Sequence, residues 1–169
     1  MSGEAVSEAA LMRLFEAARW APSSGNFQPW RFIYATADGP HFAQLFDLLV
    51  EGNRAWCTHA GALIVVLSRN AFDNGKPART HSYDAGAAWM SMALEGHWMG
   101  LVVHGMAGFN FDRARTELGV PDDYTVEAMV AVGHPGSVED LSEKDRAREG
   151  KSSRRPVRKS VFEGRFPAA

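Results

Sequence analysis

Residues 62–68, ALIVVLS, constrain the fold of this chain more than any other segment, because six consecutive apolar residues precede the first polar one, Ser68. A strand with one face in water alternates between apolar and polar side chains, whereas a strand covered on both faces reads as a continuous apolar run. The segment therefore predicts a strand at the centre of a sheet, with other elements packed on both sides.

The composition is that of an ordinary globular protein with one core. The chain has 169 residues, 46% of them hydrophobic and 22% charged, and a formal net charge of −2, so no charge excess points to nucleic acid or to an anionic membrane. Cys57 is the single cysteine, which excludes an intramolecular disulfide and fits a reducing compartment. No apolar run approaches the ~20 residues of a membrane span, and the first residues do not resemble a signal peptide. We expect a cytoplasmic protein.

Helical and strand patterns alternate along the chain. Ser7 is a candidate N-cap for the first helix, which Pro22 would end. Alternation of this kind favours a doubly wound parallel sheet. The final segment, 137–169, is polar and has almost no apolar periodicity, so it is either disordered or lies on another surface such as a second subunit. The expected helices are 8–20, 41–53, 82–98 and 111–121, and the expected strands are 30–35, 62–68, the start of 101–109, and 126–134.

The helix expected at 82–98 combines alanine and glycine with large apolar residues on nearly all sides. A helix that is apolar all round is buried, and small residues let a second helix approach closely. We therefore expect this helix to be buried.

The common catalytic motifs are missing from the sequence. His59, His81, His97 and His104 have no recognisable metal-ligand spacing. The chain contains no G-x-S-x-G nucleophile motif, and neither the Walker pattern nor G-x-G-x-x-G occurs. If the protein is an enzyme, a bound cofactor is expected to supply the chemistry, while the protein supplies orientation and electrostatics.

Three segments are suited to binding a planar, phosphorylated ligand. WAPSSGNFQPWRF (20–32) carries small hydrogen-bonding side chains, GMAGF (105–109) allows close backbone approach, and KSSRRPVRK (151–159) is strongly basic. Taken singly, each has a simpler interpretation, as a helix-to-strand connector, a strand-ending turn and a solvated basic run. The residues alone leave both interpretations open.

In combination and in this order, these segments resemble the nitroreductase family of FMN-dependent NAD(P)H oxidoreductases. The resemblance is carried by LFEAARWAPSSGNFQPWRF, DAGAAWMSMALEGHWMGLVVHGMAGF, VAVGHPG and SSRRPVRKSVFEGRF, which together span nearly the whole chain. It implies an α+β nitroreductase-like fold with a central mixed β-sheet flanked by helices, in place of the doubly wound sheet. It also implies a single domain over 1–169 and a homodimer with FMN at the interface, in which the extended tail 137–169 reaches across to the partner subunit.

The resemblance also implies a set of flavin contacts. The Pro-Ser-Ser-x-Asn loop would touch the flavin, as would an asparagine just after the second helix and the backbone of the turn before Gly-Phe. An arginine near the C-terminus would bind the FMN phosphate, with Arg155 as the near alternative to Arg154. The chemistry would take place on the flavin rather than on a protein side chain: NADH or NADPH gives a hydride to flavin N5, and an electron-poor small molecule such as a nitroaromatic or a quinone then takes the electrons. The implied cofactor-binding residues are Pro22, Ser23, Ser24, Asn26, Asn53, Met106, Ala107, Gly108, Arg154 and Arg155.

Two departures from the family pattern leave alternatives open. The sequence begins MSGEAVSEAAL, without the Arg-rich R-x-S-x-R segment that helps members of the family hold FMN. Trp56 stands where many relatives have a basic residue. The alternative expectation is a dimeric flavin- or ligand-binding protein with weak or no reductase activity. Flavin fragmentation or reductive dehalogenation is a third hypothesis, with residues 69–81 as a candidate substrate lid.

Overall fold

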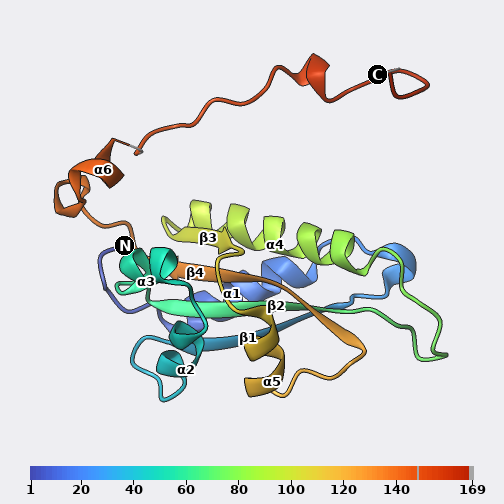
Figure 1. The fold of residues 1–169 in the computed structure, drawn as a ribbon, viewed down its shortest axis with the longest axis horizontal. Helices are drawn as coiled ribbons and strands as arrows, with labels where there is room; N and C mark the ends of the chain where they lie inside the picture. The colour runs from blue at the N-terminus through green and yellow to red at the C-terminus, as the bar shows by residue number, and fades with distance from the viewer. Residues whose placement is uncertain (148, 168–169) are drawn as a thin grey trace. The chain divides into compact units, whose positions relative to one another are not determined.

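The computed structural model describes residues 1–147 and 149–167. The chain divides into two compact units, Met1–Gly136 and Ser137–Ala169. Figure 1 shows that in the first unit helices accompany a single sheet. The elements of this unit are α1 (Glu8–Arg19), β1 (Trp30–Thr36), α2 (Phe42–Asp47), α3 (Glu51–Cys57), β2 (Ala62–Arg69), α4 (His81–Trp98), β3 (Val102–Met106), α5 (Phe111–Glu117) and β4 (Tyr124–Gly133).

The sheet has the strand order β1-β2-β4-β3, and each neighbouring pair is antiparallel. The α+β class is therefore confirmed, but the described strands form an antiparallel sheet where the resemblance implied a mixed one. The doubly wound arrangement is wrong for a topological reason. β2 and β3 do run in the same direction and are joined through α4, but β4 lies between them and separates what would have been a parallel pair.

β2 is the buried central strand that its apolar run predicts. Every residue from Ala62 to Ser68 is buried, and the side chains alternate between two cores. Leu63 and Val65 pack in a core with residues of α2, α3 and α5, whereas Ile64 packs in a second core with residues of α1 and α4. The continuous apolar run thus reflects a strand with helices on both faces.

The first helix begins as the sequence predicts. The Ser7 hydroxyl accepts a hydrogen bond from the Ala10 amide at 3.2 Å, which satisfies one of the free donors at the start of α1. The helix ends at Arg19, three residues before Pro22. α5 has a comparable cap, in which the Asn110 side chain accepts from the Arg113 amide at 2.9 Å.

The single helix predicted over 41–53 is wrong, because the structure divides this segment into α2 and α3. Between them Val50 is extended (φ −71°, ψ 156°), and its amide donates to the Gly108 carbonyl at 3.0 Å. Leu49 forms an isolated antiparallel bridge with Phe109. The backbone therefore leaves the helix to pair with a turn that lies far away in the sequence. As a consequence, Asn53 lies within α3 instead of just after a second helix.

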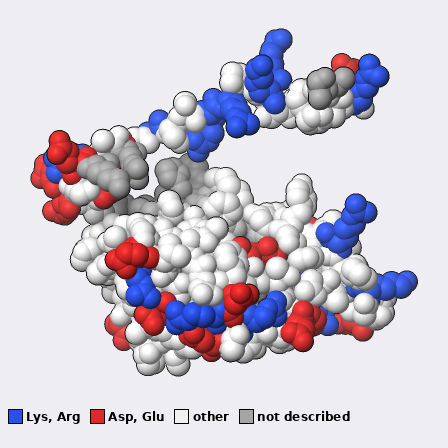
Figure 2. Space-filling model, viewed as in Figure 1, with Lys and Arg blue, Asp and Glu red and all other residues white. Residues whose placement is uncertain are grey.

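α4 is not buried on all sides within this chain, contrary to the expectation for 82–98. One face, with Ala85, Ala88 and Met92, packs in the core. On the rest of the helix Tyr83 and Trp98 are each 82% exposed. Figure 2 shows that on the visible face of the first unit the surface over α4 is largely uncharged. The exposed apolar face of α4 consists of Tyr83, Met90, Leu94 and Trp98, whereas the Trp89 ring lies beside Gly105 of β3.

The second unit contains short helical turns, so the tail is not extended throughout. These turns are Val138–Asp140, α6 (Glu143–Arg146) and Val157–Lys159. The predicted contact of this segment with a partner subunit stays a prediction. Among the helices of residues 1–147 and 149–167, none combines the length and apolarity needed to cross a bilayer.

Candidate functional site

The loop that follows α1 has a tightly specified backbone. A 3₁₀ turn spans Ser24–Asn26, and Gly25, Asn26 and Gln28 all have left-handed φ values, of 58°, 55° and 52°. For residues other than glycine this conformation costs about 1 kcal/mol or more, and it persists where the surroundings enforce it. One of the enforcing contacts is local, because the Ser23 hydroxyl accepts from the Gln28 amide at 3.0 Å.

This loop presents polar side chains to solvent. Ser24 and Asn26 are exposed, and among the hydrogen bonds of the described residues none involves the Ser24 hydroxyl or the Asn26 side-chain amide. The two flanking tryptophans differ, since Trp30 is buried in the core while Trp20 is 74% exposed and stacks with Arg19. The loop therefore holds hydrogen-bonding groups in place that the fold itself does not use.

A second cluster joins α3 to the turn after β3. The Asn53 side-chain amide donates to the Gly108 carbonyl at 3.0 Å, and the Trp56 indole donates to the Asn53 side-chain oxygen at 3.2 Å. A Cβ atom at Gly108 would lie only 2.4 Å from Asn53 Nδ2. The structure thus brings together two of the predicted site residues, and a side chain at Gly108 would displace the Asn53 amide. The contact between Asn53 and Trp56 was not foreseen from the sequence.

The turn at 106–108 leaves backbone donors available. Met106 is buried, with its sulfur 3.9 Å from the Cys57 sulfur, while Ala107 is exposed. Among the loop and turn hydrogen bonds of residues 1–147 and 149–167, none is donated by the Ala107 or Gly108 amide. Adjacent free amides of this kind suit an electronegative ligand atom.

Cys57 does not serve as a nucleophile. It is the last residue of α3 and is fully buried, and this burial raises the pKa of its thiol from 9.0 to about 12. The thiolate is the reactive form of cysteine, so at neutral pH the side chain behaves as a small apolar residue.

Ser68, His81 and Glu127 form a cluster with the residue types of a hydrolase triad. Ser68 Oγ lies 2.7 Å from His81 Nδ1 and also bonds to Glu127 Oε1. The arrangement is not catalytic, because the Ser68 hydroxyl has no solvent exposure and Ser68 and Glu127 both face the same ring nitrogen. It ties the start of α4 to β2 and β4. No sequence spacing signals this cluster, since sheet pairing alone brings Ser68 and Glu127 together.

Arg154 and Arg155 belong to the second unit, where both are exposed. The Arg154 guanidinium bonds to the Ser152 hydroxyl at 2.5 Å and to the Ser153 carbonyl at 3.2 Å. Their role at a phosphate stays a prediction. Within the part of the chain that the structure describes, no three His, Cys, Asp or Glu side chains gather as metal ligands.

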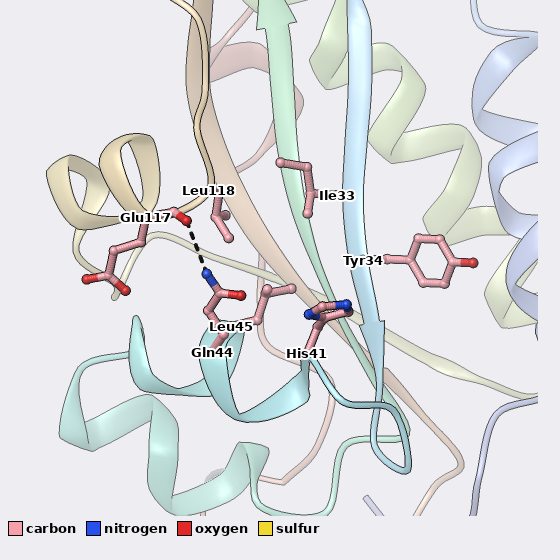
Figure 3. Close-up of a pocket in the computed structure, with 7 residues that line it drawn as sticks. All are labelled: Ile33, Tyr34, His41, Gln44, Leu45, Glu117 and Leu118. Carbon is pink, nitrogen blue, oxygen red and sulfur yellow. Dashed lines mark hydrogen bonds between the residues drawn. The ribbon is translucent and has the colours of Figure 1, made fainter.

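A pocket of about 290 Å³ lies elsewhere on the first unit, between β1, α2 and the end of α5. Figure 3 shows that Gln44 bridges it by a hydrogen bond to the Glu117 carbonyl, at 3.1 Å, and that the Tyr34 ring points away from this bridge. None of the predicted site residues lines this pocket, so it is separate from the two clusters. Its lining residues are Ile33, Tyr34, His41, Gln44, Leu45, Glu117 and Leu118.

Comparison with known proteins gives consistent results. The sequence profile described as the nitroreductase family matches residues 2–134. A crystal structure titled as an oxidoreductase containing FMN is 41% identical, with a TM-score of 0.94 over 99% of this chain and 87% of that one. A provisionally named nitroreductase in complex with FMN, from Desulfovibrio desulfuricans, is 30% identical, with a TM-score of 0.73 over 97% of this chain and 88% of that one. A Streptomyces coelicolor protein, provisionally named NADH dehydrogenase/NAD(P)H nitroreductase, is 28% identical over 77% of this chain and 74% of its own length.

Proposed function

This chain belongs to the nitroreductase family, and we propose on that premise that it is an FMN-dependent oxidoreductase. In this proposal NADH or NADPH is the hydride donor, and an electron-poor small molecule such as a nitroaromatic or a quinone is the acceptor. Two relatives whose titles name FMN support the cofactor, and the name of the Streptomyces coelicolor relative supports NAD(P)H as the donor. The cytoplasmic location expected from the sequence stays a prediction.

The observation that carries the proposal is the turn at 106–108 beside Asn53. The Ala107 and Gly108 amides have no partner among the described loop and turn bonds, and the Asn53 amide lies against Gly108, where an added Cβ would be 2.4 Å from Asn53 Nδ2. These features fit a flat ring system that needs close backbone approach and donors for its ring nitrogen and oxygen atoms. Ala107, Gly108 and Asn53 would hold the ring, with Met106 behind them.

The loop after α1 supplies the remaining polar contacts in this proposal. Ser24 and Asn26 would bond to the polar edge of the ring or to the ribityl chain, and Pro22 and Ser23 would shape the loop around them. When bound, FMN supplies the two-electron chemistry at N5. The protein orients the flavin through the loop after α1, whose backbone is fixed by residues with left-handed φ values, and it supplies hydrogen-bond donors to the ring.

Homodimerisation is part of the proposal. The exposed apolar face of α4, with two side chains that are 82% exposed, is the kind of surface that monomeric proteins rarely leave in water. The second unit carries its own exposed apolar side chains, including Val157, Val161 and Phe166. The second unit also carries Arg154 and Arg155, which would bind the FMN phosphate, since guanidinium groups bind phosphate in bidentate fashion.

The test is spectroscopic. Purified protein should show flavin absorbance, or acquire it after addition of FMN, and NADH or NADPH should bleach that absorbance under anaerobic conditions. Protein that takes up no FMN would refute the proposal. Protein that binds FMN but is not reduced by either nucleotide would favour the alternative, a flavin-binding protein with little turnover. Sedimentation of the same sample would report whether it is a dimer.

A further inference from the structure

Asp84 is a buried carboxylate outside the proposed flavin contacts. It lies in the first turn of α4 and is 4% exposed. Its Oδ2 atom accepts hydrogen bonds from the Ser24 amide at 3.1 Å and from the Thr80 hydroxyl at 3.2 Å. One of these donors belongs to α4's own N-cap, and the other belongs to the loop 22–28, sixty residues earlier.

The two donors have different consequences for the fold. The bond from Thr80 is local and supports the start of α4, where a negative charge also interacts favourably with the helix dipole. The bond from Ser24 fixes the first residue of a turn whose next residues, Gly25 and Asn26, are both left-handed. Removing a carboxylate from water is unfavourable unless donors compensate it, so the buried Asp84 constrains this loop amide to one position.

We propose that Asp84 is a positioning residue for the flavin loop, acting through the Ser24 amide and without touching the flavin. This inference rests on the proposed function, because the loop is the one assigned to FMN. Asp84 holds Ser24 and Asn26 in their binding arrangement before FMN arrives, so that binding does not have to order the loop.

The first experiment compares Asp84→Ala, Asp84→Asn and Thr80→Val with the wild type. FMN affinity is measured by flavin fluorescence, and exchange of the Ser24 amide hydrogen is measured by NMR in flavin-free protein. We expect Asp84→Ala to weaken FMN binding at least tenfold and to speed Ser24 exchange at least tenfold. Asp84→Asn, whose amide oxygen can still accept the bond, and Thr80→Val, which removes only the local donor, should stay within threefold of the wild type.

A second pair of variants tests the same contact from the loop side and covers the case in which Asp84→Ala does not fold. Ser24→Pro removes the amide hydrogen, and the first position of a helical turn accepts proline, here after an extended Ser23 (φ −146°, ψ 155°). Ser24→Ala removes only the hydroxyl. We expect Ser24→Pro to bind FMN at least fivefold more weakly than Ser24→Ala.

Two results would overturn the inference: FMN affinity and Ser24 exchange unchanged in Asp84→Ala, or a loss of affinity in Thr80→Val as large as in Asp84→Ala. Equal affinities for Ser24→Pro and Ser24→Ala would likewise count against it. Wild-type protein that takes up no FMN would refute the proposed function instead. The exchange rate of Ser24 would then still decide whether Asp84 holds the loop.

Discussion

Gly108→Ala should destabilise the protein mainly through one steric conflict, with Asn53. The added Cβ would lie 2.4 Å from Asn53 Nδ2 and 3.1 Å from Val50 Cγ2. The first distance is far below van der Waals contact, so the Asn53 side chain must leave its position and lose its bond to the Gly108 carbonyl. Overpacking of this kind costs about 1–3 kcal/mol, and the lost hydrogen bond is part of that cost. Gly108 is not in a left-handed conformation, so backbone strain adds nothing.

A double-mutant cycle with Asn53→Ala isolates this conflict. Asn53→Ala alone removes the bonds to Gly108 and Trp56, at about 0.5–1.5 kcal/mol for each bond. In that background the contact with the Asn53 amide is gone and the milder approach to Val50 Cγ2 at 3.1 Å remains, so Gly108→Ala should cost at least ~1 kcal/mol less than in the wild type. Gly52→Ala is the matched control. Gly52 lies in α3 next to Asn53, and no heavy atom lies within 4 Å of the added Cβ. This substitution should be neutral or stabilising, as expected for glycine replaced within a helix.

The assay is the free energy of unfolding from urea titration of flavin-free protein, at one protein concentration for all variants. Costs of Gly108→Ala and Asn53→Ala that add to within ~0.5 kcal/mol would refute the reasoning, since independent sites are additive to that degree. A wild-type stability for Gly108→Ala would refute it as well.

Three further predictions concern other parts of the chain. Gly96→Ala should lower the free energy of unfolding by about 1–3 kcal/mol, because its Cβ would lie 2.3 Å from Val103 Cγ2. Urea unfolding should show that most of this cost disappears in a Val103→Ala background. An equal cost with Val103 and with Ala at position 103 would contradict the prediction. Burial raises the Cys57 pKa from 9.0 to about 12. Between these two pH values the unfolded chain loses the thiol proton while the folded protein keeps it, so the free energy of unfolding is unaffected below pH 9 and declines as the pH rises toward 12. Between pH 8 and pH 10 the free energy of unfolding of the wild type should fall by about 1.4 kcal/mol more than that of Cys57→Ala. Unfolding curves at the two pH values would test this, and equal declines in both proteins would argue against it. Arg154→Ala should weaken FMN binding roughly tenfold or more, as loss of a charge-assisted contact implies. The control Arg158→Ala should change FMN affinity by less than about threefold. Equal effects of the two substitutions in fluorescence titrations would remove Arg154 from the phosphate site.

Local pattern predicted much of the first unit. The apolar run at 62–68 predicted the central strand, and Ser7 predicted the start of α1, because burial on both faces and helix capping each depend on a few neighbouring residues. The family resemblance named Asn53 and Gly108, which the structure then brought into contact at 3.0 Å. Their roles toward a flavin stay predictions.

The sequence by itself determined which strand is buried on both faces and where the first helix begins, since these properties follow from residue type and spacing. Only the tertiary structure decided the rest. The break between α2 and α3 lies at Val50, whose amide bonds to the Gly108 carbonyl, 58 residues later, and not to a carbonyl of its own helix. The insertion of β4 between β2 and β3, and the bond from Ser24 to Asp84, likewise join segments far apart in the chain. Backbone hydrogen-bonding groups are nearly identical at every residue, so the sequence carries no local mark of which distant partner each one will take.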